Sequence, residues 1–142
     1  MSEAVAVLIQ VVSVQEDAQK ERQTLRRTFS GELRRLPQGP VLRYVERDEE
    51  GAETDVEIRI EEKGARLLRR GICAMELTLV PGETSRSVYQ TPYGAMDLTV
   101  RTQEASFSET GAGAKVGLRY DVYVQAELLS RNTVQVTYRV KP

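Results

Sequence analysis

The chain has 142 residues and a net charge of -1, with 20 basic and 21 acidic side chains interspersed along it. This length fits one domain, residues 1–142, and the charge balance lacks the basic excess of a nucleic-acid-binding protein, so no nucleic acid partner is expected. The absence of histidine and the presence of only one cysteine, Cys73, exclude the usual zinc sites and the triads that depend on histidine.

We therefore expect no metal site, no cofactor and no catalytic residue, and we do not expect an enzyme, although catalysis by carboxylates, Lys or Tyr and a carboxylate magnesium site remain open. A single cysteine cannot form an intramolecular disulfide, which favours a cytoplasmic location. The apolar start of the chain carries Glu3 where a signal peptide has its positive region. No run approaches the roughly 20 apolar residues of a membrane helix, so no membrane association is expected.

The first elements along the chain are predicted to be strands. Residues 4–15 are dense in β-branched side chains, which favour a strand, and the polar residues 15–23 predict a connection. Residues 24–36 are ambiguous, because a spacing of four keeps side chains on one face of either a helix or a strand, as it does for Leu25, Phe29 and Leu33. Gly31 in the middle and Thr28 beside Phe29 favour a strand.

Turn signals then divide the chain at short, regular spacing. Turns are predicted at residues 37–40, 48–51, 62–64, 81–82 and 92–94. The alternating apolar residues between these turns predict strands at residues 41–47, 56–60, 65–70, 75–79, 85–91 and 96–100. Residues 102–109 either extend the last of these strands or bend away from it, and residues 110–114 are predicted to form a flexible loop.

The last quarter of the chain alternates apolar and polar residues almost without a break, over residues 116–127 and again over residues 134–140. This period of two predicts long antiparallel strands with one buried face. In total, about eight to ten strands are predicted, and they indicate an all-β fold in which a single antiparallel meander closes into a β-barrel.

Five short motifs occur in a fixed order along the chain: Phe29-Ser30-Gly31, Tyr44-Val45-Glu46, Arg69-Arg70-Gly71, Tyr89-Gln90-Thr91-Pro92-Tyr93-Gly94 and Gly117-Leu118-Arg119-Tyr120-Asp121. Together they resemble the YwiB-like family of uncharacterised bacterial proteins, a domain of unknown function with a calycin-type, lipocalin-like barrel. The resemblance runs from the first strand nearly to the C-terminus. It implies a calycin-like barrel of about eight strands and no established activity, substrate or cofactor.

One signature of related barrels is absent. Fatty-acid-binding barrels place an Arg-X-Tyr pair on their last strands, so that both side chains reach one ligand carboxylate. Here Arg119 and Tyr120 are neighbours, and so are Tyr138 and Arg139. Because neighbours on a strand point to opposite faces, neither pair can form that clamp.

Arg69 is the first candidate site residue. It shares a strand face with Leu67, so it points into the barrel if Leu67 does. A guanidinium inside a barrel needs a partner, because an unpaired buried charge is costly. Glu46, on the same face as Leu42 and Tyr44, is the natural partner, and the pair would lock two strands together. Alternatively, Arg69 would bind a ligand carboxylate or phosphate.

The remaining candidates are tyrosines. Tyr120 and Tyr138 lie in the apolar rows of the last two strands, and Tyr89 precedes a turn. They would present hydroxyls to a ligand, or they would fill the core and flank the turn with no ligand involved. The candidate ligand-binding residues are Arg69, Glu46, Tyr44, Tyr89, Tyr120 and Tyr138.

Two functions are expected of such a barrel. The first is the binding of a small molecule inside the barrel or at its mouth, since a barrel of about eight strands is just wide enough to hold one. The alternative is an interaction or structural module with a filled barrel, which docks a protein partner or self-associates as a homodimer. Alternation splits the basic pair Arg26-Arg27 across two faces, so these side chains are interpreted as ordinary surface charge.

Overall fold

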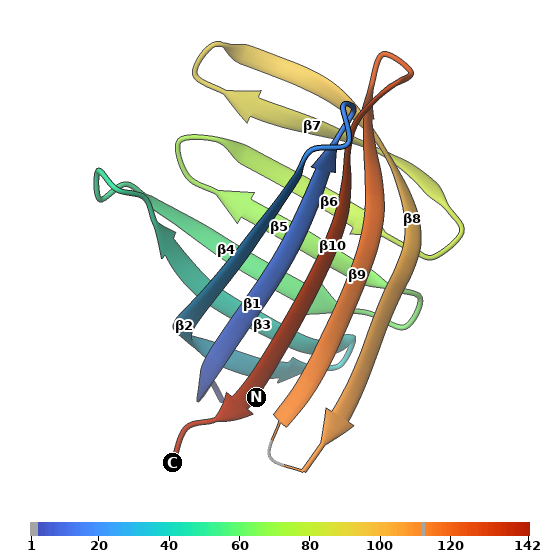
Figure 1. Ribbon diagram of the computed structural model, residues 1–142. Helices are drawn as coiled ribbons and strands as arrows, with labels where there is room; N and C mark the ends of the chain where they lie inside the picture. Colours follow the sequence, from blue (N-terminus) through green and yellow to red (C-terminus); the bar gives the residue numbers. More distant parts are fainter. Residues whose placement is uncertain (1–2, 112) are drawn as a thin grey trace.

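The computed structural model describes residues 3–111 and 113–142, and within these ranges every regular element is a strand. Ten antiparallel strands each pair with the next in the chain, and β1 pairs with β10 to close the barrel (Figure 1). The predicted all-β meander and its closure are therefore confirmed. The strands are β1 (Val5–Asp17), β2 (Arg22–Leu36), β3 (Gly39–Arg47), β4 (Glu53–Ile60), β5 (Ala65–Arg70), β6 (Ala74–Leu79), β7 (Thr84–Thr91), β8 (Gly94–Thr110), β9 (Gly113–Val124) and β10 (Glu127–Val140).

The barrel has a wall of long strands and a wall of short ones. Strands β8, β9, β10, β1 and β2 have 12 to 17 residues, whereas β3 to β7 have 6 to 9. In Figure 1 the long strands pass obliquely in front of the short ones. The connections β1–β2, β3–β4, β5–β6, β7–β8 and β9–β10 lie at one end of the barrel, here called the hairpin end, and both chain termini lie at the other, the terminal end. In the described ranges, no helix is long and apolar enough to cross a membrane.

Alternating apolar residues fill the terminal half of the barrel. Its most deeply buried side chains include Val7, Ile9, Leu42, Leu79, Val100, Val116 and Val136. Each such side chain stabilises the fold by about 1.5–3 kcal/mol relative to an exposed position. In the hairpin half, the same inward rows carry polar residues such as Ser13, Glu46 and Arg69, and the interior is not filled.

The pairing between β6 and β7 is unusually sparse. Only Ala74 and Gln90 are paired residues of a ladder there, whereas β9 and β10 are paired along nearly their whole length. The Ser85 hydroxyl donates to the Thr78 carbonyl at 2.9 Å, and the Ser87 hydroxyl donates to the Glu76 carbonyl. Side chains thus replace backbone donors along this part of the wall.

The wall also opens between β2 and β3. Residues 32–36 of β2 pair with β3, whereas residues 22–31 pair with β1 alone. Gly31 lies at the branch point, where an added Cβ atom would be 2.5 Å from the Arg43 carbonyl oxygen, so this close approach requires glycine. Phe29 stacks on Tyr44 just beyond, with the ring centroids 4.5 Å apart. The opening lies beside the unpaired part of β2, toward the hairpin end.

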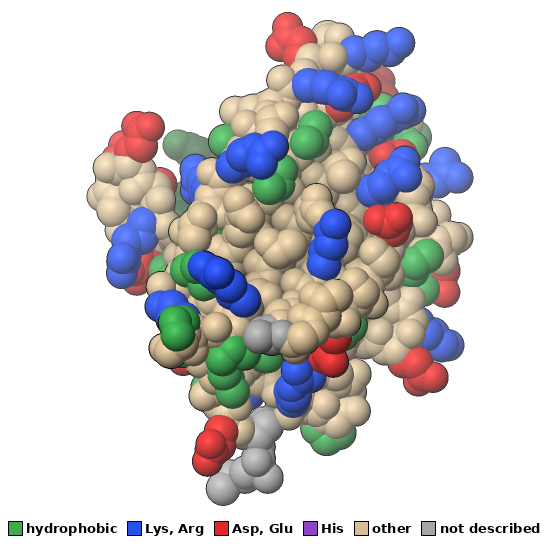
Figure 2. All heavy atoms as spheres, turned by 60° about the horizontal axis from the view of Figure 1, so that its bottom comes forward, with side chains coloured by type: hydrophobic (Ala, Val, Ile, Leu, Met, Phe, Trp, Pro, Cys, Tyr) green, Lys and Arg blue, Asp and Glu red, His purple; other side chains and the backbone are tan. Residues whose placement is uncertain are grey.

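Charged side chains on the outer face of the short strands pair within and between strands. Arg43 on β3 and Arg59 on β4 both contact Glu57 on β4, and Arg66 on β5 contacts Glu76 on β6. An exposed pair such as Arg66 with Glu76 contributes ~1 kcal/mol or less. On the face shown in Figure 2, Lys and Arg side chains are spread over the surface and are densest at the upper right, where acidic side chains lie among them.

Several predicted boundaries are corrected. Residues 24–36 belong to β2, as favoured, but the connection predicted at residues 15–23 is only a tight turn. The Asp17 carboxylate accepts the backbone N–H groups of Gln19 and Glu21, both at 2.9 Å, which lets the chain reverse within four residues.

Two corrections and one open alternative concern the strands after residue 36. Gly39 and Pro40, predicted in a turn, begin β3. Of the two alternatives for residues 102–109, the structure has the first: they continue β8 past a bulge between Thr102 and Glu104. The loop predicted at residues 110–114 is shorter, since β9 begins at Gly113, and Ala112 of that loop lies outside the described residues.

The turn between β9 and β10 lies earlier than the break between the two alternating segments, residues 116–127 and 134–140, predicts. It lies at Gln125 and Ala126, which have φ values of 50° and 67°. Two successive residues in the left-handed region make a tight hairpin turn that usually contains glycine or asparagine. Because this turn contains neither, its position was not apparent from the sequence, and β10 begins at Glu127 instead of residue 134.

Candidate functional site

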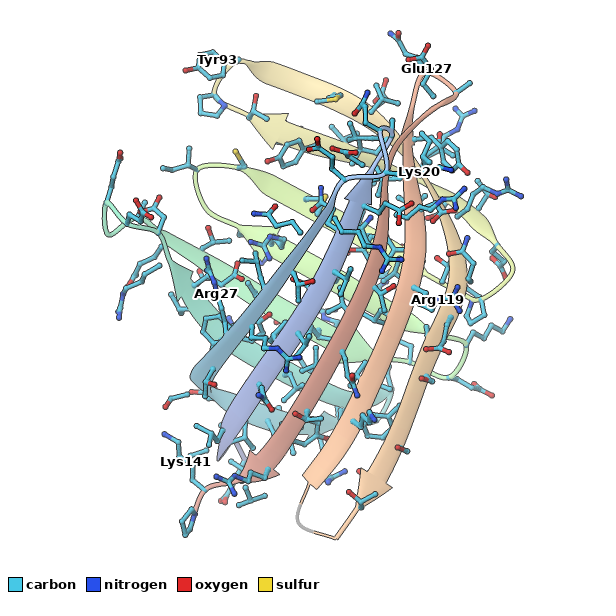
Figure 3. All side chains as sticks on the ribbon, viewed as in Figure 1. Lys20, Arg27, Tyr93, Arg119, Glu127 and Lys141 are labelled. Atoms are coloured by element: carbon cyan, nitrogen blue, oxygen red, sulfur yellow. The ribbon has the colours of Figure 1, made fainter. Side chains whose placement is uncertain are left out.

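The hairpin half of the barrel encloses a cavity of about 550 Å³. Its floor is formed by Ile58, Leu77 and Leu118, all almost completely buried. In Figure 3, Tyr93 and Glu127 mark hairpin tips at the end where the cavity lies, whereas Lys141 lies at the opposite end. The interior is thus half filled and half hollow, which does not meet the condition of a filled barrel on which the alternative of a docking module was based.

Most of the cavity lining is apolar. Between the floor and the mouth, the apolar lining includes Val11, Phe29, Leu67, Met75, Leu98, Val122 and Val134. At the mouth, Leu25, Met96 and Leu129 are 44%, 39% and 50% exposed. The rim therefore offers apolar side chains that are accessible from solvent and continuous with the interior.

An ion pair connects β5 and β3 within the cavity wall. The Arg69 guanidinium donates to the Glu46 carboxylate, and the two side chains are 36% and 19% exposed. Both residues line the cavity, and β4 lies between their strands. The predicted pairing is confirmed, and the carboxylate is the more desolvated partner.

Two tyrosine hydroxyls lie beside this ion pair. Tyr44 on β3 and Tyr120 on β9 line the cavity and are 6% and 7% exposed. Burial raises the pKa of Tyr120 to about 12, against the opposing effect of the Arg69 guanidinium. Burial and, to a smaller extent, the Glu46 carboxylate raise the pKa of Tyr44. Both hydroxyls are therefore protonated donors at neutral pH, and neither has a hydrogen-bond partner among the described residues.

A second guanidinium lies at the mouth. Arg27 comes from the part of β2 that leaves β3, and it lines the cavity while remaining exposed (Figure 3). In the described ranges, no carboxylate forms a salt bridge with it. Arg27 and Arg69 are the cations of the lining and Glu46 is its carboxylate, so the lining carries an excess of one positive charge.

Tyr89 lies where the cavity meets a smaller pocket of about 350 Å³ beneath the β3–β4 and β5–β6 hairpins. A hydrogen bond with Cys73, more than burial, raises the pKa of Tyr89. Arg69 and Met75 line both spaces. Among residues 3–111 and 113–142, no group of three or more Cys, Asp or Glu side chains is arranged to hold a metal ion.

The family described as Domain of unknown function (DUF1934) matches residues 9–136 of the chain, which contain most of the barrel and all of the cavity lining. The chain belongs to this family. The crystal structure of the ywiB protein from Bacillus subtilis is similar to this DUF1934 domain, with a TM-score of 0.86 at 18% identity over 99% of this chain and 96% of that one. The resemblance to YwiB-like proteins is thereby confirmed, and at this identity it shows the fold alone. No curated protein matches the chain.

Five of the six candidate residues of this DUF1934 domain come together around the cavity: Arg69, Glu46, Tyr44, Tyr89 and Tyr120. Tyr138 does not line it. It lies in the filled half, where its hydroxyl is buried without a hydrogen-bond partner among the described residues. Burial raises the pKa of Tyr138. Alternation indicates which side of a strand faces inward, but it does not indicate how far along the barrel a residue lies.

Sequence reasoning missed five polar residues of the lining: Ser13, Gln15, Arg27, Ser130 and Asn132. Arg27 was interpreted as surface charge, although it shares a strand face with Leu25 and Phe29, and this alternation was the available signal. The Asn132 side-chain amide donates to the Ser130 hydroxyl at 3.0 Å, and both residues line the cavity. They precede the predicted start of the last strand, so no pattern pointed to them.

Proposed function

We propose that this DUF1934 domain binds one small, mostly apolar molecule in the cavity of its hairpin half. The observation that carries the proposal is the continuous apolar lining around a space of about 550 Å³. Pockets for small molecules have volumes of roughly 300–1,000 Å³ and combine apolar walls with a few convergent polar groups. Protein interiors otherwise leave few voids larger than a water molecule.

The energetics of an apolar cavity support the same proposal. The apolar side chains that line it lack the contacts that packed neighbours would supply. A bound apolar molecule restores these contacts and stabilises the folded state in proportion to its occupancy. The accessible rim side chains Leu25, Met96 and Leu129 provide a route from solvent that does not require the core to open.

Native mass spectrometry of the purified protein tests the proposal directly, and we expect a co-purifying molecule of low mass. The unloaded protein should also enhance the fluorescence of N-phenyl-1-naphthylamine, a neutral apolar probe. Val11 lines the cavity and its neighbour Val12 points to the outside of the same strand. We therefore expect Val11→Phe to reduce probe binding and the matched Val12→Phe to leave it unchanged. Absence of both a bound molecule and probe binding, or equal binding by the two variants, would contradict the proposal.

A further inference from the structure

Three side chains of the cavity lining, Tyr44, Tyr120 and Arg69, offer hydrogen-bond donors to a ligand. Tyr44 and Tyr120 present unpartnered hydroxyls, and Arg69 has five N–H donors, more than its contact with Glu46 uses. The carboxylate of the lining, Glu46, already accepts from Arg69. A ligand beside these three side chains therefore meets free donors, whereas the carboxylate nearest to them is already paired.

The hydroxyls of Tyr44 and Tyr120 open into the cavity, because neither is among the fully buried polar atoms that lack a partner in the described residues. A ligand atom that accepts from them in this largely apolar surrounding gains hydrogen bonds, and such bonds contribute more when the acceptor is charged. Tyr120 lies on the wall of long strands and Arg69 on the wall of short ones, yet the guanidinium influences the pKa of both Tyr120 and Tyr44. The two walls thus bring the three side chains near one another inside the barrel.

The charge of the lining favours an anion. Arg27 at the mouth has no salt-bridge partner among the described residues, so the excess of one positive charge is not cancelled within the cavity. A cation of this kind attracts an anionic ligand and raises its concentration at the entrance.

The hydroxyl-bearing side chains of the lining are more buried than its apolar rim, which favours one orientation of a bound ligand. Tyr44 and Tyr120 are almost as buried as the floor residues, whereas the rim residues Leu25, Met96 and Leu129 are 39% to 50% exposed. A ligand that accepts from the tyrosine hydroxyls with one end therefore leaves its other end against an apolar rim.

We infer that the ligand is an amphipathic anion, of the class of a medium-chain carboxylate, held with its charged group inward against Arg69, Tyr44 and Tyr120 and its apolar chain toward the rim. This inference rests on the proposed function and specifies its ligand class. It uses side chains from β3, β5 and β9, and so differs from a clamp of two residues on the last strands.

Three ligands with the same chain and different head groups test the inference: decanoate, decanol and decylamine. Titration calorimetry on the unloaded protein should show decanoate binding about 10- to 100-fold more tightly than decanol, because hydrogen bonds to a charged group contribute about 1.5–3 kcal/mol. Decylamine should bind more weakly than decanol, since it brings a cation to a site with excess positive charge.

A matched pair of variants identifies the head-group site. We expect Tyr120→Phe to weaken decanoate binding about tenfold or more while leaving decanol unchanged. Tyr138→Phe removes a fully buried, unpartnered hydroxyl from the filled half and should change the binding of neither ligand. Both variants retain the ring and lose no hydrogen bond to the described residues, so both should fold; Tyr44→Phe provides a second test of the same site.

The outcomes separate this inference from the proposed function. If decanol binds as tightly as decanoate, if decylamine binds best, or if Tyr120→Phe binds decanoate as well as the unaltered protein, the inference is wrong and the binding function stands. If none of the three ligands binds and no molecule co-purifies, both are refuted.

Discussion

Removing Arg69 should destabilise the barrel more than neutralising Glu46, although the two side chains form one ion pair. Arg69→Met leaves the Glu46 carboxylate inside the wall, where it is only 19% exposed. Glu46→Gln leaves Arg69 with an amide oxygen that still accepts its hydrogen bond, and the guanidinium, at 36% exposed, also reaches water. Each variant therefore leaves one charge without its ionic partner, and the carboxylate left by Arg69→Met is more desolvated than the guanidinium left by Glu46→Gln.

The magnitude follows from the partial burial. Breaking a fully buried pair costs about 3–5 kcal/mol and an exposed pair ~1 kcal/mol or less, so we expect about 2 kcal/mol for Arg69→Met and about 1 kcal/mol for Glu46→Gln. The double variant strands no charge and should recover about 1–2 kcal/mol of the summed loss.

Urea unfolding of the four proteins, followed by circular dichroism, measures this cycle. Arg47→Met is a matched control, because Arg47 pairs with Glu53 between β3 and β4 and both side chains are largely exposed. It should cost ~1 kcal/mol or less. Additive effects at Arg69 and Glu46, or a larger loss from Glu46→Gln, would refute the reasoning.

Three further expectations concern the backbone, the tyrosines and the sparse part of the wall. Gly31→Ala should cost about 1–3 kcal/mol in urea unfolding, because its Cβ would meet the Arg43 carbonyl oxygen, whereas Gly117→Ala meets only side-chain atoms that can move; equal losses would contradict this. The raised pKa of Tyr120 means that the unfolded chain loses this proton first as pH rises, so stability should be full below about pH 10 and fall between about pH 10 and 12, by on the order of 3 kcal/mol. Urea unfolding across this range should show a smaller fall for Tyr120→Phe, and an unchanged fall would disprove the assignment. Hydrogen exchange read by mass spectrometry should be faster in β7 than in β9, since the β6–β7 ladder has one residue pair; equal protection would indicate a continuous ladder.

The fold was largely predictable because it depends on the alternation of apolar and polar residues, which is visible in the sequence. Alternation indicated the buried faces correctly over residues 116–124 and 134–138, although Ala126 and Val140 of the same rows are exposed. Gly31 with Thr28 favoured a strand where the spacing of apolar residues left a helix open. The turn at Gln125 and Ala126 was not predictable, because its left-handed conformations are held by the flanking ladder rather than by glycine.

The sequence predicted which residues point into the barrel better than it predicted how far along the barrel each residue lies. Because alternate residues of a strand point to the same face, the sequence predicted Arg69, Glu46 and Tyr120 inside the barrel. All three line the cavity. They could not separate Tyr120 from Tyr138, because both lie in apolar rows and differ only in their distance along the barrel. That distance depends on the stagger between strands, which is set by long-range pairing.

The unpaired part of β2 has a consequence for solubility. A free strand edge is a template on which a second copy of the chain can extend the sheet. Residues 22–31 form such an edge, and a symmetric antiparallel register of this segment with itself is centred between Arg26 and Arg27. Arg26 of each copy would then lie directly opposite Arg27 of the other, and like charges in that position destabilise a strand pair. The opening in the barrel wall is thus protected from edge-to-edge aggregation by arginines at its own centre.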